Sequence, residues 1–259
     1  MFLFDGNNTK DQCKLVNTDI QIFIEGTDEL VFRGSNKVVL AGAGFSARKH
    51  FNITSPEITP SYNTKLELEN TDNSGSGSSN SKVYLFAVGT DGCGTENSQV
   101  YPVDYRSWIG TDALVPFRYV TTDLGGDLRN KYFGRKEVSG GYFAYYFKAF
   151  ENNPTLVQRF VDGTIIDSGV YENSNTNDVE TYVELNLKIT KEDCREFFIS
   201  KDGINDARVN TISLLTAWPK VVNGITYYQD IRPLTKLNFP NESLIDSTKG
   251  LDIIYHIYY

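Results

Sequence analysis

The sequence is poor in histidine, methionine, tryptophan and cysteine, and the few histidines and cysteines leave little material for familiar catalytic or metal sites. Two His and three Cys are present among 259 residues. Cys13, Cys93 and Cys194 share no metal-ligand or redox spacing, and their odd number argues against a disulfide framework. His50 and His256 belong to no nucleophile signature. We therefore expect reduced thiols, no catalytic residues, no metal site and no cofactor, and a protein that is not an enzyme.

Long apolar runs and clusters of basic residues are also missing. No segment approaches the about 18–20 apolar residues that a membrane span needs. Residues 1–5 have no basic flank and begin no apolar region of signal-peptide length. The net charge is −8, and the absence of a basic patch argues against direct contact with nucleic acid. We expect a protein made in the cytoplasm that has neither a membrane nor a nucleic acid as its partner.

Aromatic residues and turn formers are abundant instead. The chain has 16 Phe and 16 Tyr, which suit a pleated, half-buried surface, and its short alternating runs are separated by Gly, Pro and Asn. This pattern predicts a single domain over residues 1–259. The domain should be mainly β, with antiparallel sandwich-like sheets and one or two short helices. The expected strands span residues 20–24, 30–32, 38–40, 62–69, 82–88, 115–121, 131–138, 141–150, 155–161, 181–189, 225–228, 234–239 and 251–259.

Two short helices are expected. Thr190 followed by Asp193 resembles a capping box, in which each side chain accepts a hydrogen bond from the backbone of the other residue. Residues 44–51 are expected to form one or two further helical turns. Residues 204–215 are compatible with either a short helix or a strand. The most aromatic segment, residues 142–147 (YFAYYF), predicts a strand that is buried on both faces.

The last nine residues indicate a strand that expects a partner. Ile253, Tyr255, Ile257 and Tyr259 alternate on one face. Chain ends usually fray unless contacts hold them. An aromatic, β-prone end therefore predicts pairing with a sheet of this chain or with one on a neighbouring subunit. These four residues are our first candidates for an interaction role.

A low-complexity segment, residues 71–81 (TDNSGSGSSNS), has too few apolar side chains to pack by itself. We expect a flexible loop or the tip of a hairpin arm. A surface loop is the simpler interpretation. The other is an arm that becomes ordered against a neighbour, with Ser76 and Gly77 at the contact.

Two glycine-rich segments imitate ligand-binding motifs. Residues 38–47 (VVLAGAGFSA) imitate a dinucleotide fingerprint, with Glu67 at about the distance of a ribose-binding acid. No buried parallel strand follows, so we expect a strand-to-helix turn in which glycine supplies backbone freedom. Residues 91–97 (DGCGTEN) place acidic and amide oxygens on a loop, as a calcium site would. They lack the alternating ligands of such a site, so we expect a plain turn.

Several segments together resemble structural proteins of tailed bacteriophage particles. The most characteristic is the closing pattern, residues 230–239 (DIRPLTKLNF) followed by Asn241-Glu242 and residues 254–258 (IYHIY). The resemblance is to tail, neck or baseplate components. It implies a virion subunit that acts by assembling with other virion structural proteins and with copies of itself, and it implies no active-site residues. The resembling segments are 38–51, 86–94, 114–133, 142–150, 183–198 and 230–259.

Two other functions stay open. One is a carbohydrate-binding receptor-recognition protein of the virion, because aromatic side chains in loop-like sequence could stack on sugars. The other is a polysaccharide hydrolase with paired carboxylates, whose spacing is spatial and not visible in a sequence. The candidate residues are Tyr101, Tyr105, Trp108 and Trp218 for sugar stacking, and the pairs Glu67/Glu69 and Glu180/Glu184 for hydrolysis.

Overall fold

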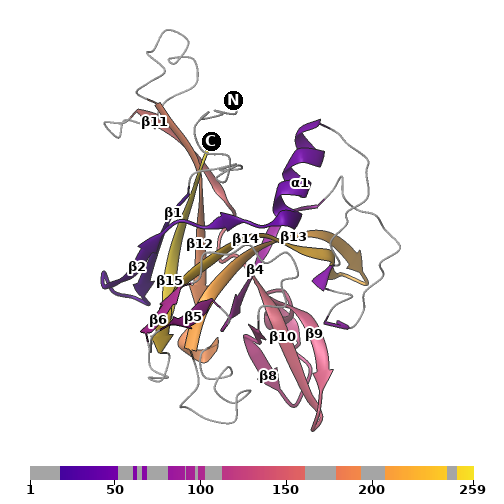
Figure 1. Cartoon of the computed structure of the whole chain (residues 1–259). Helices are drawn as coiled ribbons and strands as arrows, with labels where there is room; N and C mark the ends of the chain where they lie inside the picture. Colours follow the sequence, from indigo (N-terminus) through magenta and orange to yellow (C-terminus); the bar gives the residue numbers. More distant parts are fainter. Residues whose placement is uncertain are drawn as a thin grey trace.

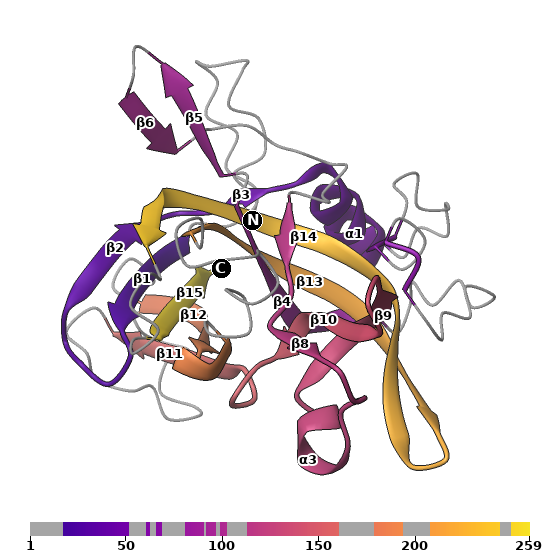
Figure 2. The same cartoon turned by 90° about the horizontal axis from the view of Figure 1, so that it is seen from below.

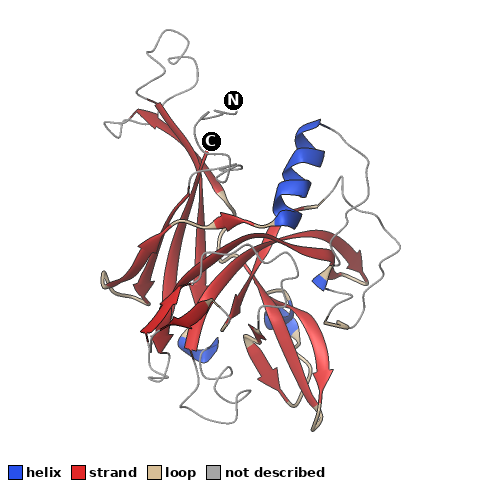
Figure 3. Cartoon of the chain, viewed as in Figure 1, coloured by secondary structure: helices blue, strands red, loops and turns tan. Residues whose placement is uncertain are grey.

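The chain folds into two antiparallel sheets that pack together, which confirms the expected mainly β, sandwich-like fold. Strands dominate the cartoon, and helices are few and short (Figure 3). Among the described residues, no helix is long and apolar enough to cross a membrane. The computed structural model describes residues 18–51, 61–62, 66–68, 81–90, 92–96, 99–102, 113–160, 179–193, 208–243 and 250–259.

The first sheet has five strands in the order β11-β12-β15-β1-β2 (Figure 1). Its central strand, β15, is the last of the chain and pairs with β12 on one side and β1 on the other. The strands are β1 (Thr18–Ile24), β2 (Leu30–Gly34), β11 (Thr155–Phe160), β12 (Val179–Ile189) and β15 (Leu251–Tyr258).

The second sheet has eight strands and is built around a long hairpin. Its path is β3-β14-β13-β4-β10-β8, while β7 pairs with β4 and β9 pairs with β10. A small separate sheet consists of β5 (Cys93–Glu96) and β6 (Gln99–Pro102). The strands of the large sheet are β3 (Lys37–Val38), β4 (Lys82–Gly89), β7 (Leu114–Val115), β8 (Arg118–Val120), β9 (Tyr132–Val138), β10 (Tyr142–Ala149), β13 (Arg208–Val222) and β14 (Ile225–Ser243).

One hydrophobic core lies between the two sheets. A second core is formed by residues of the large sheet together with Tyr62 and Leu68. Ile22, Leu187 and Tyr255 of the first sheet share a cluster with Phe86 and Leu214 of the second. Strand β10 contributes to both clusters, because Tyr145 lies in this one and Phe147 in the other. Tyr145 and Phe147 share one face of β10, while Ala144 and Lys148 lie on the other, and all four are at most 1% exposed. The expectation that the aromatic strand is buried on both faces is therefore confirmed for residues 144–148.

Helix α1 (Leu40–Phe51) corrects the expected boundary near residues 38–44. Residues 38–40 were expected to be a strand, but the helix already begins at Leu40, so Gly42 lies inside it and not at a turn. A Cβ on Gly42 would lie 2.0 Å from the carbonyl oxygen of Leu234 in β14. Glycine is required here because the helix backbone approaches the sheet closely, and backbone freedom in a turn is not the reason.

Residues 62–69 were expected to form a half-buried strand, and this was wrong for the part that is described. Tyr62 is helical and its carbonyl accepts a hydrogen bond from the backbone N–H of Leu66 at 2.9 Å. Glu67 has a positive φ of 53°. Tyr62 and Leu68 are buried in the second cluster. These two side chains reach the core from a helical residue and from the end of a turn, and not from alternate positions of a strand.

Two further expectations were wrong in part, because residues 93–96 of the expected plain turn form β5, and the expected strand at 115–121 is divided between β7 and β8. The ambiguous segment 204–215 contributes its described part to strand β13. The two expected strands at 225–228 and 234–239 are parts of one continuous strand, β14. The loop or arm expected at residues 71–81 lies outside the described residues except for Ser81, which is buried beside β4.

The terminal strand lies in the interior of its sheet. Ile253 and Tyr255 are almost completely buried, and the strand is paired along both edges from Leu251 to Ile257. Of the two partners that the sequence left open, the structure shows the one within this chain. Strand addition to a neighbour through β15 would require breaking these pairings.

We predict that Ile253→Ala destabilises the fold by about 2–5 kcal/mol, because it empties a well-packed core site. The measurement is the free energy of unfolding from urea titration followed by tryptophan fluorescence. Ile254→Ala is the matched control, since Ile254 is the next residue of the same strand and lies on its half-buried opposite face. Equal losses for the two variants would contradict the placement of the core.

Candidate functional site

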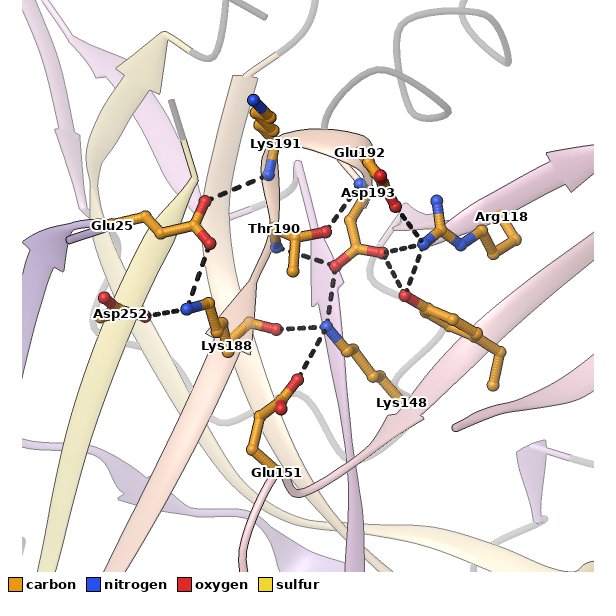
Figure 4. A network of polar contacts seen from close by, with 11 residues as sticks. Glu25, Arg118, Lys148, Glu151, Lys188, Thr190, Lys191, Glu192, Asp193 and Asp252 are labelled. Carbon is orange, nitrogen blue, oxygen red and sulfur yellow. Dashed lines mark hydrogen bonds and ion pairs between the residues drawn. The ribbon is translucent and has the colours of Figure 1, made fainter. Parts of the chain in front are cut away.

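The strongest constellation of charged side chains surrounds Asp193, just after strand β12 (Figure 4). The expected capping box is present. The backbone N–H of Thr190 donates to Asp193 Oδ2 at 2.8 Å, and the backbone N–H of Asp193 donates to Thr190 Oγ1 at 3.2 Å. Residues 191–193 are helical. The local sequence thus fixes the carboxylate where the chain leaves the first sheet.

Asp193 is buried and receives donors from the other sheet. Lys148 Nζ of β10 lies 2.8 Å from Oδ2, and both side chains are almost fully buried. The hydroxyl of Tyr132 in β9 donates to Oδ1 at 2.7 Å. The guanidinium of Arg118 in β8 lies 3.5 Å from the same oxygen and donates to the Tyr132 hydroxyl at 2.8 Å. Three strands of the large sheet therefore converge on one carboxylate.

The network continues across the edge of the first sheet. Lys148 Nζ also donates to the carbonyl of Lys188 at 2.7 Å. The ammonium of Lys188 in turn lies 3.1 Å from Glu25 and 3.5 Å from Asp252. Glu25 accepts a hydrogen bond from the backbone N–H of Lys191 at 3.3 Å. Figure 4 shows these contacts as one chain of polar groups from β8 and β10 to β12 and β15.

The chemistry of this cluster is that of a saturated ion-pair network. Oδ2 of Asp193 accepts hydrogen bonds from Lys148 and from the backbone N–H of Thr190. Oδ1 accepts one from Tyr132 and lies 3.5 Å from the Arg118 guanidinium, so both oxygens of this buried carboxylate are engaged by the protein's own donors. Burial, and then the charge of Asp193, raises the pKa of the Tyr132 hydroxyl above its ordinary value of 10.0. A tyrosine that holds its proton more firmly is a hydrogen-bond donor and not a base. The arrangement fits a structural clamp between the sheets.

A second buried polar contact ties the same two sheets near helix α1. The hydroxyl of Tyr255 in β15 accepts a hydrogen bond from the side-chain amide of Asn36 and lies 3.0 Å from Thr235 Oγ1 in β14. Thr18 Oγ1 of β1 donates to Asn36 Oδ1 at 2.9 Å. Burial raises the pKa of Tyr255 above its ordinary value. This contact also joins sheets and leaves its hydroxyl protonated.

The face of the first sheet that points away from the core carries a row of paired polar side chains. His256 Nε2 of β15 lies 3.1 Å from Glu184 Oε2 of β12. Asp19 of β1 is opposite His256 and accepts from Arg33 Nε at 2.8 Å. The hydrogen bond from Arg33 holds the pKa of Asp19 below its ordinary value of 3.8. Both carboxylates are engaged by neighbours, as in the usual stabilising pairs of a sheet face.

The carboxylates considered for hydrolysis do not form a matched pair where they are described. Glu180 and Glu184 share one face of β12 but are four residues apart, which is about 13 Å along a strand. Glycosidase pairs lie about 5–9.5 Å apart. Glu180 is instead 3.1 Å from Arg159. Glu67 is exposed, 3.8 Å from Lys136, and Glu69 lies outside the described residues.

The remaining sequence candidates are scattered. Ile257 is half-buried and Tyr259 is 76% exposed at the end of β15. Trp218 is half-buried on β13, and the side chains of Tyr101, Tyr105 and Trp108 lie outside the described part, as do Ser76 and Gly77. The Cys93 thiol donates to the carbonyl of Phe239 at 3.2 Å. Within the described ranges, no group of three or more His, Cys, Asp or Glu could hold a metal ion.

Sequence reasoning identified the capping box but missed its partners. Lys148 was the available signal, because a lysine inside a strand that is buried on both faces needs a carboxylate. Arg118 and Tyr132 gave no such signal, since their approach depends on the pairing of β8 and β9 with β10.

Comparison with known proteins gives no relative. No protein-family model matches the chain, no curated protein matches it, and no solved structure matches it.

We predict that Asp193→Asn lowers the free energy of unfolding by about 3–5 kcal/mol, because it leaves the buried ammonium of Lys148 with only the longer, 3.7 Å ion pair to the more exposed Glu151. Urea titration measures this. The control is Glu192→Gln, which removes the neighbouring exposed acid 3.4 Å from Arg118 and should cost about 0–1 kcal/mol. The double variant Lys148→Met/Asp193→Asn should recover part of the loss. A loss for Asp193→Asn no larger than the control's would contradict the clamp.

The raised pKa of Tyr132 predicts a loss of stability at alkaline pH. The folded-state pKa lies above the unfolded-state value near 10.0. The contribution is therefore complete below pH 10 and is lost as the pH rises through the folded-state pKa. In Tyr132→Phe, the urea midpoint should fall less steeply above pH 10 than in the wild type. Tyr142→Phe, on β10 outside the network, serves as control, and equal slopes for Tyr132→Phe and the wild type would refute the assignment.

Proposed function

We propose that this protein is a structural subunit of a tailed bacteriophage particle, in its tail, neck or baseplate, and that it acts by assembly with other virion proteins. The observation that carries the proposal is the projecting end of the β13–β14 hairpin. Beyond the last pairing of β13 with β4, at Ala217, these two strands pair only with each other among the described strands. Figure 2 shows the hairpin reaching past the rest of the large sheet.

The hairpin ends in a tight turn and its tip is apolar. Asn223 and Gly224 both have positive φ, at 52° and 79°, as the favoured two-residue hairpin turn requires. Val221 is 67% exposed, and Val222 and Ile225 are exposed beside it. A single exposed aliphatic residue is ordinary on a protein surface. Three of them together at the end of one hairpin form an apolar cluster that suits a contact with another protein. β-Branched side chains held on a rigid turn lose little conformational entropy on docking.

The polar networks support assembly over chemistry. The most buried acid, Asp193, is saturated by donors, and the row around His256 consists of paired side chains. These groups hold strands and sheets together. Among the described residues, the tip of the β13–β14 hairpin adds exposed apolar side chains on strands, which is the material of protein–protein contacts.

Sugar binding remains the second candidate, because aromatic and charged side chains gather on the outer face of the first sheet. Tyr182 lies 4.6 Å from His256 and 5.2 Å from Tyr258, measured between ring centroids, and Arg159 lies over Tyr182. Binding of the purified protein to a glycan array, lost in Tyr258→Ala, would favour this function. An array without signal would remove it.

We predict that Val221→Lys/Val222→Lys reduces incorporation into virus particles by at least about ten-fold, which corresponds to about 1.4 kcal/mol of contact free energy. Mass spectrometry of particles purified from cells infected by the encoding phage measures incorporation. The control is Leu128→Lys, the same chemical change at an exposed site on α3 (Gly126–Arg129). Urea titration should show both proteins folded. Particles that lack the wild-type protein altogether would refute the proposed function.

A further inference from the structure

Lys148 and Asp193 bring an amine and a carboxyl group together in the dry interior between the sheets. Nζ of Lys148 lies 2.8 Å from Oδ2 of Asp193, and the two side chains are 2% and 1% exposed. Cγ of Asp193 is bonded to this oxygen, so a small rotation of the carboxyl group brings Nζ to the roughly 3–3.5 Å of a near-attack arrangement. An amine and a carboxyl group held in this way can condense to an amide.

We propose that Lys148 and Asp193 form an intramolecular isopeptide bond that links the two sheets covalently. The bond between Nζ and Cγ forms, the bond between Cγ and Oδ2 breaks, and Oδ2 leaves as one water molecule. Two of the three ammonium protons leave with this oxygen. Nothing is oxidised or reduced, and no co-reactant is consumed. The inference goes beyond the proposed function, because the bond depends only on the fold of the subunit.

The first proton passes within the pair. Transfer from the ammonium of Lys148 to Oδ2 of Asp193 gives a neutral amine and a neutral carboxyl group, which are the reactive forms. Burial reduces the cost of this transfer, because both charges have lost their hydration in the interior. Burial also favours the amide, since its formation removes two buried charges and the closed site keeps bulk water from the product.

Two oxygen atoms orient the nitrogen of Lys148. The carbonyl of Lys188 accepts a hydrogen bond from Nζ at 2.7 Å, and Oε1 of Glu151 lies 3.7 Å from Nζ. A neutral amine whose two N–H groups point to these oxygens directs its lone pair to its third neighbour, Asp193 (Figure 4). Glu151 then accepts the second proton as the C–N bond forms and gives it up to the departing oxygen, which is the role of a general base and acid.

The other carboxyl oxygen, Oδ1 of Asp193, is held by donors of the large sheet. Attack on Cγ places negative charge on this oxygen. The hydroxyl of Tyr132 donates to it at 2.7 Å, and the guanidinium of Arg118 lies 3.5 Å away. Pre-positioned donors of this kind stabilise an oxyanion as it develops. The same donors stabilise the starting carboxylate, so we expect the bond to form slowly after folding, once in each molecule.

A second lysine–acid pair of the same network provides an internal comparison. Nζ of Lys188 lies 3.1 Å from Oε1 of Glu25, but these side chains are 35% and 24% exposed. Water solvates both charges and keeps them in their ionised, unreactive forms. Closeness without burial is therefore expected to leave Lys188 and Glu25 unlinked.

Intact-mass measurement of the denatured full-length protein tests the bond. The wild-type protein should be lighter than its sequence by the mass of one water molecule. A tryptic digest should contain a branched peptide that joins Lys148 to Asp193, and none that joins Lys188 to Glu25. A wild-type protein that keeps its full sequence mass, with Lys148 and Asp193 in separate peptides, overturns the inference.

Glu151→Gln tests the proton route and leaves both linked residues in place. The Glu151 side chain is 35% exposed, so the variant should fold, which circular dichroism checks. After cell-free synthesis, the linked fraction should rise about 100-fold more slowly than in the wild type, because the general base is missing. Glu192→Gln is the matched control, since this acid lies beside Arg118 at 3.4 Å, and it should link at the wild-type rate. Equal rates for Glu151→Gln and the wild type would overturn the role of Glu151.

Discussion

The buried ion pair between Asp193 and Lys148 decides how the two sheets dock. The carboxylate is fixed by a capping box at the end of β12, and the ammonium comes from the middle of the large sheet. Charges in a protein interior are costly unless they are paired and hydrogen-bonded. Any docking that separates them would leave an uncompensated charge, at a cost of about 3–5 kcal/mol. Apolar burial brings the sheets together, and this pair selects one arrangement.

The surrounding polar contacts also favour one docking arrangement of the sheets, with a smaller free-energy penalty if they are broken. Tyr132 and Arg118 supply the remaining donors of Asp193, while Tyr255 joins β15 to Thr235 and Asn36 at another part of the same core. Each is a polar group that must find its partner on another strand or sheet. A core of aliphatic and aromatic side chains alone tolerates sliding, because hydrophobic attraction has no direction. The polar contacts provide the direction.

How much of this could be predicted depended on whether the signal was local. Most strands of the two main sheets, the capping box and the burial of the aromatic strand follow from alternation and from a four-residue motif, and these were predicted, whereas β5, β6 and most of β13 were not. Residues 62–69 misled because their alternation is real, yet Tyr62 and Leu68 pack at turn spacing. Gly42 misled because glycine is needed there to let the helix approach the backbone of Leu234, which is far away in the sequence. The clamp around Asp193 was missed although Lys148 gave a signal, because its donors Arg118 and Tyr132 meet only once strands β8 to β10 have paired.

The last strand shows why folding and assembly must be assigned to different residues. Its sequence indicated a strand in need of a partner, and in the structure β12 and β1 satisfy that need from both sides. A truncation of this strand would therefore remove the centre of a sheet and part of the core, and lost assembly would only report lost folding. Among the described residues, Val221 at the tip of the β13–β14 hairpin and Leu156 on β11 are exposed apolar side chains that lie outside the core. Because each lies beyond the shared core, a charge placed there changes a contact surface and leaves the clamp in place, so assembly can be altered separately from folding.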